Sequence, residues 1–183
     1  MVDVIEITID EFKDAIYNKY VVLFPKEEQR EWNKIEKTCK RGIEKMYKIV
    51  LDEKTIGFFM LEKINDFPFY LDYFAIYNEY QNKGYGTQAI ERLITKYVNN
   101  AGIIGEIEKE SKQDINTIKR YKFYEKLGFN KIESEYLLYG VLYTPIAYAS
   151  HKKYSKDEYD KIFFEYYTVN CGNDAVKKNC KII

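Results

Sequence analysis

The sequence contains few of the residues that build metal sites and disulfide frameworks. Its 183 residues include three cysteines and one histidine. The cysteines, Cys39, Cys171 and Cys180, are odd in number and lack the paired spacing of a zinc site. We therefore expect no bound metal, and thiols that stay reduced.

Long apolar runs and an excess of charge of one sign are also missing. No stretch approaches the roughly 18 apolar residues of a membrane span. The first residues, MVDVIEITIDEF, carry acids where a signal peptide needs basic side chains. The 29 basic and 29 acidic side chains cancel, so the charge does not favour a nucleic-acid partner. We expect a cytoplasmic protein that binds neither membranes nor nucleic acid.

What remains is the composition of a folded domain. Hydrophobic residues make up 46% of the chain, which is enough for a buried core at this length. Without repeats or a low-complexity linker, we expect one domain over residues 1–168. The last residues, 169–183, show no clear period and are expected to form a loosely ordered tail.

The hydrophobic pattern predicts an α/β (α+β) fold. Strands are expected at Val4–Ile9, Met46–Leu51, Thr55–Lys63, Phe69–Ile76, within residues 101–110, and at Phe129–Glu133 and Leu137–Ala149. Helices are expected at Glu11–Asn18 after an N-cap at Asp10, and at Lys26–Lys40, Gly86–Asn99, Asp114–Leu127 and Asp157–Tyr167. Hairpins in the first half and strand–helix–strand units later predict a mixed, mostly antiparallel sheet with helices on both faces.

One loop, between the apolar strand Phe69–Ile76 and the helix after it, has the features of an anion site. It reads QNKGYG over residues 81–86. Its glycines let the backbone approach an anion, and the first N–H groups of a helix are unpaired and carry partial positive charge. Lys83 adds charge, although glycine at such a junction can also serve only to turn the chain. The spacing is not that of a P-loop, and Ala89 replaces the last glycine of a dinucleotide fingerprint.

Two motifs together resemble the GCN5-related N-acetyltransferase (GNAT) family. QNKGYG resembles the family signature Q/R-x-x-G-x-G/A, and YLDYFAIYNEY before it is similar to the family's fourth strand. FYEKLGF, at Phe123–Phe129, resembles the second hallmark, about 37 residues further on. The expected order of elements matches the family from Val4 to Ala149. The later segment SEYLLYGVLYTPIAYA is similar to a bacterial subgroup of small acetyltransferases.

The resemblance implies acetyl-CoA as cofactor, bound between splayed, parallel fourth and fifth strands. The main chain of Phe74, Ala75 and Ile76 would pair with the pantetheine. The diphosphate would be held by the loop residues Gln81, Asn82, Lys83, Gly84, Tyr85, Gly86 and Thr87. Many family members carry Asn seven residues before the motif tyrosine, where this chain has Thr117. Asn116, one residue earlier, and Arg120 are the candidates for cofactor contacts on this helix. Lys119, Arg120 and Lys122 either meet the CoA phosphates or form the solvated face of the helix.

Two residues are candidates for the chemistry. Tyr124 matches the family tyrosine that protonates the departing thiolate, and a phenol with a pKa near ~10 carries its proton at neutral pH. Asp72 lies in an otherwise apolar strand, where partial burial would raise its pKa toward that of a general base. Alternatively, Tyr124 is a packed core residue, and Asp72 is a carboxylate that only orients the substrate. Glu106 and Glu108 share a face of the next strand, where they either attract a cationic amine or form a solvated face.

The function implied is transfer of an acetyl group from acetyl-CoA to a primary amine of a small molecule or peptide. An aromatic, acidic acceptor site would suit a cationic amine. Homodimers are common in the family. The alternatives are a non-catalytic acyl-CoA-binding module and a dinucleotide enzyme. A nucleophilic pair of His151 with Cys171 or Cys180 is disfavoured because no third group is visible.

Overall fold

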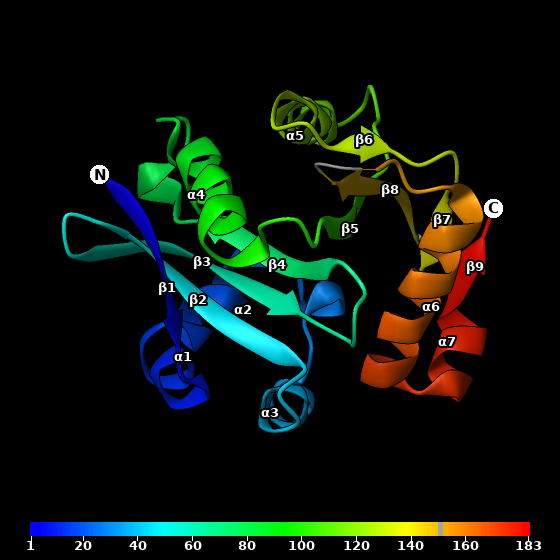
Figure 1. Ribbon diagram of the computed structural model, residues 1–183, viewed down its shortest axis with the longest axis horizontal. Coiled ribbons are helices and arrows are strands. Elements are labelled where there is room, and N and C mark those ends of the chain that lie inside the picture. Colours follow the sequence, from blue (N-terminus) through cyan, green and yellow to red (C-terminus); the bar gives the residue numbers. More distant parts are fainter. Residues whose placement is uncertain (150–151) are drawn as a thin grey trace. The chain divides into compact units, whose positions relative to one another are not determined.

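The structure is a computed structural model that describes residues 1–149 and 152–183. Over these residues the chain forms a nine-stranded sheet of order β1-β2-β3-β4-β5-β8-β7-β9, with β6 paired to β8 (Figure 1). The strands are β1 (Val2–Ile7), β2 (Glu44–Leu51), β3 (Lys54–Glu62), β4 (Phe69–Ile76), β5 (Ile103–Glu108), β6 (Asn130–Lys131), β7 (Tyr136–Leu138), β8 (Val141–Tyr148) and β9 (Cys180–Ile182).

Seven α-helices and three short helical turns connect the strands within the described ranges. The α-helices are α1 (Ile9–Ala15), α2 (Tyr17–Leu23), α3 (Trp32–Lys40), α4 (Tyr85–Leu93), α5 (Ile115–Lys126), α6 (Lys156–Cys171) and α7 (Asn173–Asn179). The turns are the 3-10 helices η1 (Lys26–Glu28) and η2 (Asn78–Tyr80) and the π-helix η3 (Ile94–Val98). None of the helices in the described residues is long and apolar enough to cross a membrane.

The sheet is mixed, as predicted. β4 and β5 are parallel, with Phe69 opposite Ile103 and Tyr70 opposite Ile104. The pairs β1–β2, β2–β3, β5–β8, β6–β8, β7–β8 and β7–β9 are antiparallel. The predicted fold class, a mostly antiparallel sheet with one parallel pair and helices on both faces, is confirmed.

The chain divides into two compact units. The first consists of Met1–Ile64 and Leu71–Asn99, and the second of Asn65–Tyr70 and Asn100–Ile183. The first unit therefore holds β1 to β3, most of β4 and α1 to α4. The second holds the beginning of β4, β5 to β9 and α5 to α7.

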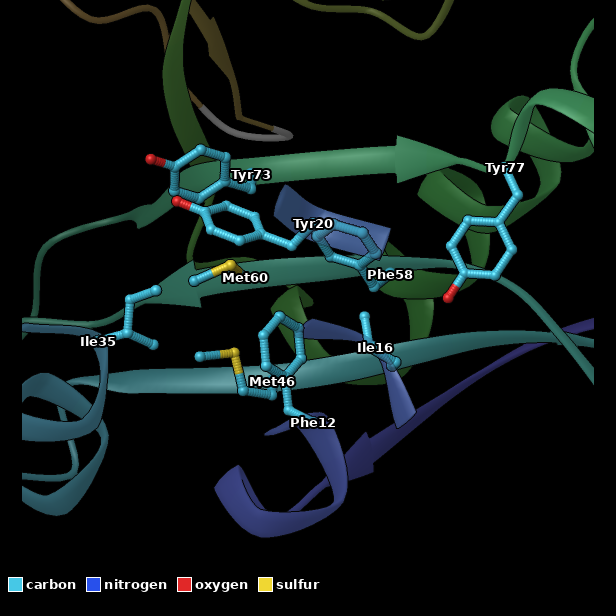
Figure 2. Close-up of a cluster of buried hydrophobic side chains, with 9 residues drawn as sticks. All are labelled: Phe12, Ile16, Tyr20, Ile35, Met46, Phe58, Met60, Tyr73 and Tyr77. Atoms are coloured by element: carbon cyan, nitrogen blue, oxygen red, sulfur yellow. The ribbon is translucent and has the colours of Figure 1, made fainter. Parts of the chain in front are cut away.

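In the first unit, one face of the strands packs against α1, α2 and α3. Figure 2 shows the cluster of buried side chains there: Phe12, Ile16, Tyr20, Ile35, Met46, Phe58, Met60, Tyr73 and Tyr77. Met46 and Met60 are directly opposite each other in the β2–β3 register, so they point to the same face. The helices therefore bury one alternating set of strand side chains.

The other alternating set points to the opposite face of the first unit. Tyr47 in β2 packs against Tyr97 of η3 with ring centroids 4.7 Å apart. Phe59 in β3 stacks on Phe74 in β4 at 4.6 Å. Figure 1 shows α4 on this side, away from α1 to α3. The buried residues of α4 are Ala89, Ile90 and Leu93.

In the second unit, α5 and α6 cover opposite faces of β8. Tyr136 lies opposite Tyr143 of β8 and stacks on Phe163 of α6 with centroids 4.2 Å apart. Tyr148 is five residues from Tyr143, so it points to the other face. There it packs at 5.5 Å against Phe129, which follows α5.

A close approach of β3 to β4 depends on Gly57. A Cβ at this position would lie 2.3 Å from the main-chain oxygen of Ala75 and 3.1 Å from the Cα of Ile76. Because those atoms belong to the backbone, they cannot move aside cheaply. We expect Gly57→Ala to lower the free energy of unfolding by about 1–3 kcal/mol, the usual cost of overpacking. Urea denaturation measures this, and an unchanged midpoint would mean that β4 tolerates the extra methyl group.

The first helix begins earlier than predicted. Its N-cap is Thr8, whose hydroxyl accepts a hydrogen bond from the Glu11 N–H at 3.1 Å, while the Glu11 carboxylate accepts one from the Thr8 N–H at 3.2 Å. This is a complete capping box. Asp10, which we predicted as the cap, instead lies in the first turn of α1.

The C-terminal region differs most from the prediction. The single strand expected at Leu137–Ala149 is a hairpin, β7 and β8, which turns at Tyr139 and Gly140, both with positive φ. Residues 169–183, expected to be a loose tail, contain the end of α6, all of α7 and β9. Because β9 pairs with β7, this segment extends the sheet.

Candidate active site

The predicted anion loop has the geometry that its glycines suggest. Gly84 is the N-cap of α4 and adopts a left-handed conformation, with φ 79° and ψ 0°. Asn82 also has a positive φ, 59°. These two residues turn the chain so that α4 starts at Tyr85. A residue with a Cβ would be strained at position 84, which explains the first glycine of the motif.

Two side chains hold the loop in place. Gln81 donates from Nε2 to the main-chain oxygen of Ile76 at 2.8 Å and to the side-chain oxygen of Asn78 at 3.1 Å. Lys83 donates from Nζ to the carbonyl of Glu79 at 2.8 Å. The Gln81 side chain thus ties the loop to the end of β4, and the Gln81 N–H also donates within the protein, to the Asn78 carbonyl at 3.3 Å.

The start of α4 fits an anionic group. In the described part of the chain, no hydrogen bond engages the N–H groups of Tyr85, Gly86 or Thr87, the first three residues of the helix. No side chain caps this end, and a Cβ at Gly84 would meet no atom within 4 Å. Three unpaired donors at a helix N-terminus, with open space beside them, form a cradle for a phosphate.

The residues predicted to pair with the pantetheine lie at the end of the strand before the loop. Phe74, Ala75 and Ile76 end β4. The N–H of Tyr77 donates to the Ile56 carbonyl of β3 at 2.8 Å. Together with the contact of Gly57 with Ala75, this hydrogen bond holds the end of β4 against β3.

Asp72 lies in a buried polar cluster, which we call the Arg30 cluster: Arg30, Thr38, Glu44, Glu62 and Asp72. Nη1 of Arg30 donates to Glu44 and Glu62, both at 3.0 Å, and to Asp72. Nη2 donates to Glu44 and Thr38, at 3.0 and 2.9 Å. The two glutamate side chains are fully buried, and those of Arg30 and Asp72 are each 13% exposed.

The Arg30 cluster changes the interpretation of Asp72. Burial raises the pKa of Asp72, as predicted, although the ion pair with Arg30 opposes this shift. For Arg30, burial opposes the charge, but the carboxylates of Asp72, Glu44 and Glu62 outweigh it and raise its pKa. The Asp72 carboxylate is nevertheless bound by the Arg30 guanidinium and only 13% exposed, so it is poorly placed to take a proton from an acceptor amine. The geometry therefore favours a structural role for Asp72, and its role as general base stays a prediction.

Tyr124 is a buried residue of α5. Its ring packs edge-on against Phe123 at 5.0 Å and Phe129 at 5.1 Å. Burial raises its pKa above the ordinary value for tyrosine, while Arg120 acts in the opposite direction. Tyr124 therefore keeps its proton at neutral pH, as a proton donor must, and no protein group accepts it among the hydrogen bonds of the described residues.

Three other predicted residues of the second unit, Glu106, Glu108 and Arg120, already have protein partners. Glu106 accepts a hydrogen bond from the hydroxyl of Tyr70 at 2.9 Å. Glu108 forms an ion pair with Arg120. An incoming ligand would have to compete with these contacts or add to them.

The start of α5 explains the missing asparagine of the motif. Thr117 is buried, and its hydroxyl accepts from the Ser111 N–H at 2.9 Å and donates to the Asp114 carbonyl at 2.7 Å. These bonds organise the N-terminus of α5, and Asp114 caps it by accepting from the Asn116 N–H. The Asn116 side chain is exposed, which leaves it accessible to a ligand.

Sequence reasoning missed Arg30 and Gly57. Arg30 lies in the charged segment that we predicted as a helix, and its partners come from four different elements. Gly57 sits in an apolar strand with no turn signal nearby. An isolated glycine in a strand does indicate close backbone approach, so this signal was present.

Two of the three free cysteines are poorly suited to nucleophilic chemistry. Burial raises the pKa of Cys39 to about 12 and that of Cys180 to about 11. These two thiols are therefore poor nucleophiles. His151, the other half of the disfavoured pair, lies outside the described residues.

The loop between β4 and α4 therefore has the geometry of a site for a phosphate-bearing ligand. Residues 9–129 match the family model for the acetyltransferase (GNAT) family. The chain belongs to this family, which confirms the predicted resemblance and the prediction of an acyltransferase. No curated protein matches the sequence.

Solved structures share the fold. A GNAT-family acetyltransferase from Bacteroides thetaiotaomicron is 22% identical with a TM-score of 0.77, over 93% of this chain and 98% of that one. NAA60 from Arabidopsis thaliana, crystallised with acetyl-CoA, is 11% identical with a TM-score of 0.64, and the match covers 83% of this chain and 100% of that one. A GNAT acetyltransferase from Elizabethkingia anophelis, also with acetyl-CoA bound, is 14% identical with a TM-score of 0.56, and the match covers 81% of this chain and 97% of that one.

Proposed function

We propose that this protein is an acetyl-CoA-dependent N-acetyltransferase whose acceptor is a primary amine of a small molecule or peptide. Residues 1–168 would form the catalytic domain. The observation that carries the proposal is the cradle of unpaired N–H groups at the start of α4, directly after β4. Membership of the GNAT family supports acetyl-CoA as the donor.

In this proposal the main chain holds the cofactor. In the loop Gln81–Thr87, the N–H groups from Asn82 onward bind the diphosphate, because the Gln81 N–H already donates to the Asn78 carbonyl. Lys83 adds positive charge beside it. The main chain of Phe74–Ile76 pairs with the pantetheine. Asn116 and Arg120 contact the cofactor from α5. Bound acetyl-CoA supplies an acetyl group activated as a thioester, which an amine can attack directly.

Tyr124 is proposed as the general acid. Its hydroxyl donates a proton to the departing thiolate, which makes the thiolate a better leaving group. The acceptor must arrive as a neutral amine or lose its proton at the site. Glu106 and Glu108 are proposed to attract a cationic amine, and Asp72 serves as base only if it is released from Arg30.

Gly84→Val tests the cradle. A branched side chain there would occupy the open space next to the helix N-terminus and strain the left-handed backbone. We expect the dissociation constant for acetyl-CoA to rise about tenfold or more, as when a phosphate loses one or two charge-assisted hydrogen bonds. Calorimetric titration measures it.

Gly42→Val is the matched control for this variant. Gly42 also has a positive φ, 70°, and open space around it, but it follows α3 instead of preceding α4. It should show a similar backbone strain and unchanged affinity for acetyl-CoA. Equal affinity of the Gly84 and Gly42 variants would contradict the cradle.

A second candidate function is a non-catalytic acyl-CoA-binding module. Two observations favour it: burial makes Tyr124 a weaker acid, and Arg30 occupies Asp72. Release of free CoA thiol, measured against a panel of primary amines, separates the two functions. Turnover of any amine supports the transferase. Tight binding of acetyl-CoA without turnover of any amine supports the module.

A further inference from the structure

The Arg30 cluster contains more negative than positive charge. If Glu44, Glu62 and Asp72 were all ionised, three negative charges would surround the single positive charge of Arg30. Oxygen atoms of the three carboxylates lie within 4.8 Å of one another. Uncompensated charge in such a buried place is costly, and the usual response is that one group takes up a proton.

The hydrogen bonds of Thr38 indicate which carboxylate is protonated. Its hydroxyl carries one proton, but three oxygens surround it: the carbonyls of Lys34 at 3.1 Å and Ile35 at 2.9 Å, and Oε2 of Glu44. With a proton on Glu44, the carboxyl group donates to Thr38 while Thr38 donates to α3. With Glu44 ionised, only one of these contacts is a hydrogen bond at a time.

The surroundings agree with this assignment. Burial raises the pKa of Glu44 to about 7 and the charge of Asp72 adds to this shift, while Arg30 and the hydrogen bond with Thr38 oppose it. Among the described residues, three further titratable groups face the cluster: Tyr20 on α2, Cys39 on α3 and Tyr73 on β4. Burial raises the pKa of each, so they stay neutral and add no further negative charge.

The cluster fastens β4 to the segment before α3. Arg30 reaches Asp72 through its side chain, and its N–H donates to the hydroxyl of Tyr20 at 2.7 Å. The Tyr20 ring packs edge-on against Tyr73 at 4.9 Å, and the Tyr73 hydroxyl donates to the carbonyl of Glu28. Two consecutive residues of β4 are thus held directly before Phe74.

We propose that Arg30, together with a proton on Glu44, is a positioning residue for the part of β4 that begins at Asp72. Loss of the proton adds negative charge beside Asp72, loosens the strand and lowers the affinity for the acetyl donor. The last step rests on the proposed function, in which the main chain of residues 74–76 holds that donor.

Carbon-13 NMR of the labelled glutamate carboxyl groups tests the proton directly. We expect one resonance to titrate near pH 7 and to be missing from the spectrum of Glu44→Gln. In Asp72→Asn the same resonance should titrate at a lower pH, because one negative neighbour is gone. If every glutamate titrates near the ordinary ~4.3, the cluster carries no extra proton and the inference fails.

Acetyl-CoA affinity between pH 6 and pH 8.5 tests the positioning role. The phosphates of the ligand titrate in this range too, so the comparison is between proteins at each pH. Glu44→Gln cannot lose the proton. Compared with this variant, the wild type should lose roughly fivefold in affinity for acetyl-CoA as the pH rises, which is the lower end of typical couplings between sites. Glu36→Gln, an exposed residue of α3 paired with Lys40, should follow the wild type.

The outcomes separate the two proposals. If the wild type and Glu44→Gln lose the same affinity for acetyl-CoA as the pH rises, Arg30 and Glu44 do not position the strand for the cofactor. If no protein binds acetyl-CoA at any pH, the proposed function fails and the positioning role fails with it. The proton on Glu44 is decided by the NMR titration in either case, including the case in which Glu44→Gln does not fold.

Discussion

Tyr124→Phe should lower kcat for acetyl transfer by about 10²- to 10⁴-fold, the usual contribution of a positioned general acid. The variant keeps the ring and its contacts with Phe123 and Phe129. It removes only the hydroxyl group, so the thiolate must leave without protonation by this residue. The affinity for acetyl-CoA should change little. Steady-state kinetics, together with calorimetric titration of acetyl-CoA, measures both quantities.

Tyr121→Phe is the matched control on the same helix. Its hydroxyl donates to Glu125 at 3.2 Å and has no role in the proposed chemistry. The kcat of this variant should stay within about twofold of the wild-type value, as expected for a surface substitution. Equal loss of kcat and of acetyl-CoA affinity in Tyr124→Phe would show that the tyrosine supports the fold instead of donating the proton.

Arg30→Met should destabilise the protein by about 3–5 kcal/mol, the cost of leaving buried carboxylates without their cation. Methionine is similar in length but cannot pair with Glu44, Glu62 or Asp72. Because protonation removes the stranded charges, the loss should be smaller at pH 5 than at pH 8. Chemical denaturation at the two pH values measures the free energy of unfolding.

Arg92→Met provides the comparison for an exposed ion pair. Arg92 bonds to Asp3 at 2.9 Å, and the two side chains are 47% and 41% exposed. Exposed pairs contribute roughly 0–1 kcal/mol, so this variant should stay within that range. A loss of similar size in both variants would mean that the Arg30 cluster is not energetically special.

The sequence predicted the elements whose periodicity was strong. β4 has the predicted bounds, and α5 ends where Gly128 follows it, with Asp114 as its N-cap. Errors occurred where local chemistry outweighed periodicity. The Thr8 capping box starts α1 early, and the left-handed residues at Tyr139 and Gly140 split a continuous apolar run into a hairpin.

The site was predictable only where a single segment carries it. The anion loop is contiguous, so its glycines and the following helix could be recognised from spacing alone. The Arg30 cluster gathers side chains from β2, β3, β4, α3 and the segment before α3. Pairing over such distances has no sequence period, so the ion pair of Asp72 with Arg30 could not be predicted.

A crystal structure of the protein with acetyl-CoA would test the central claim most directly. We predict that diphosphate oxygens lie about 2.7–3.2 Å from the N–H groups of Tyr85, Gly86 and Thr87, the range of a hydrogen bond. A cofactor bound elsewhere, with those three N–H groups contacting only water, would contradict the account.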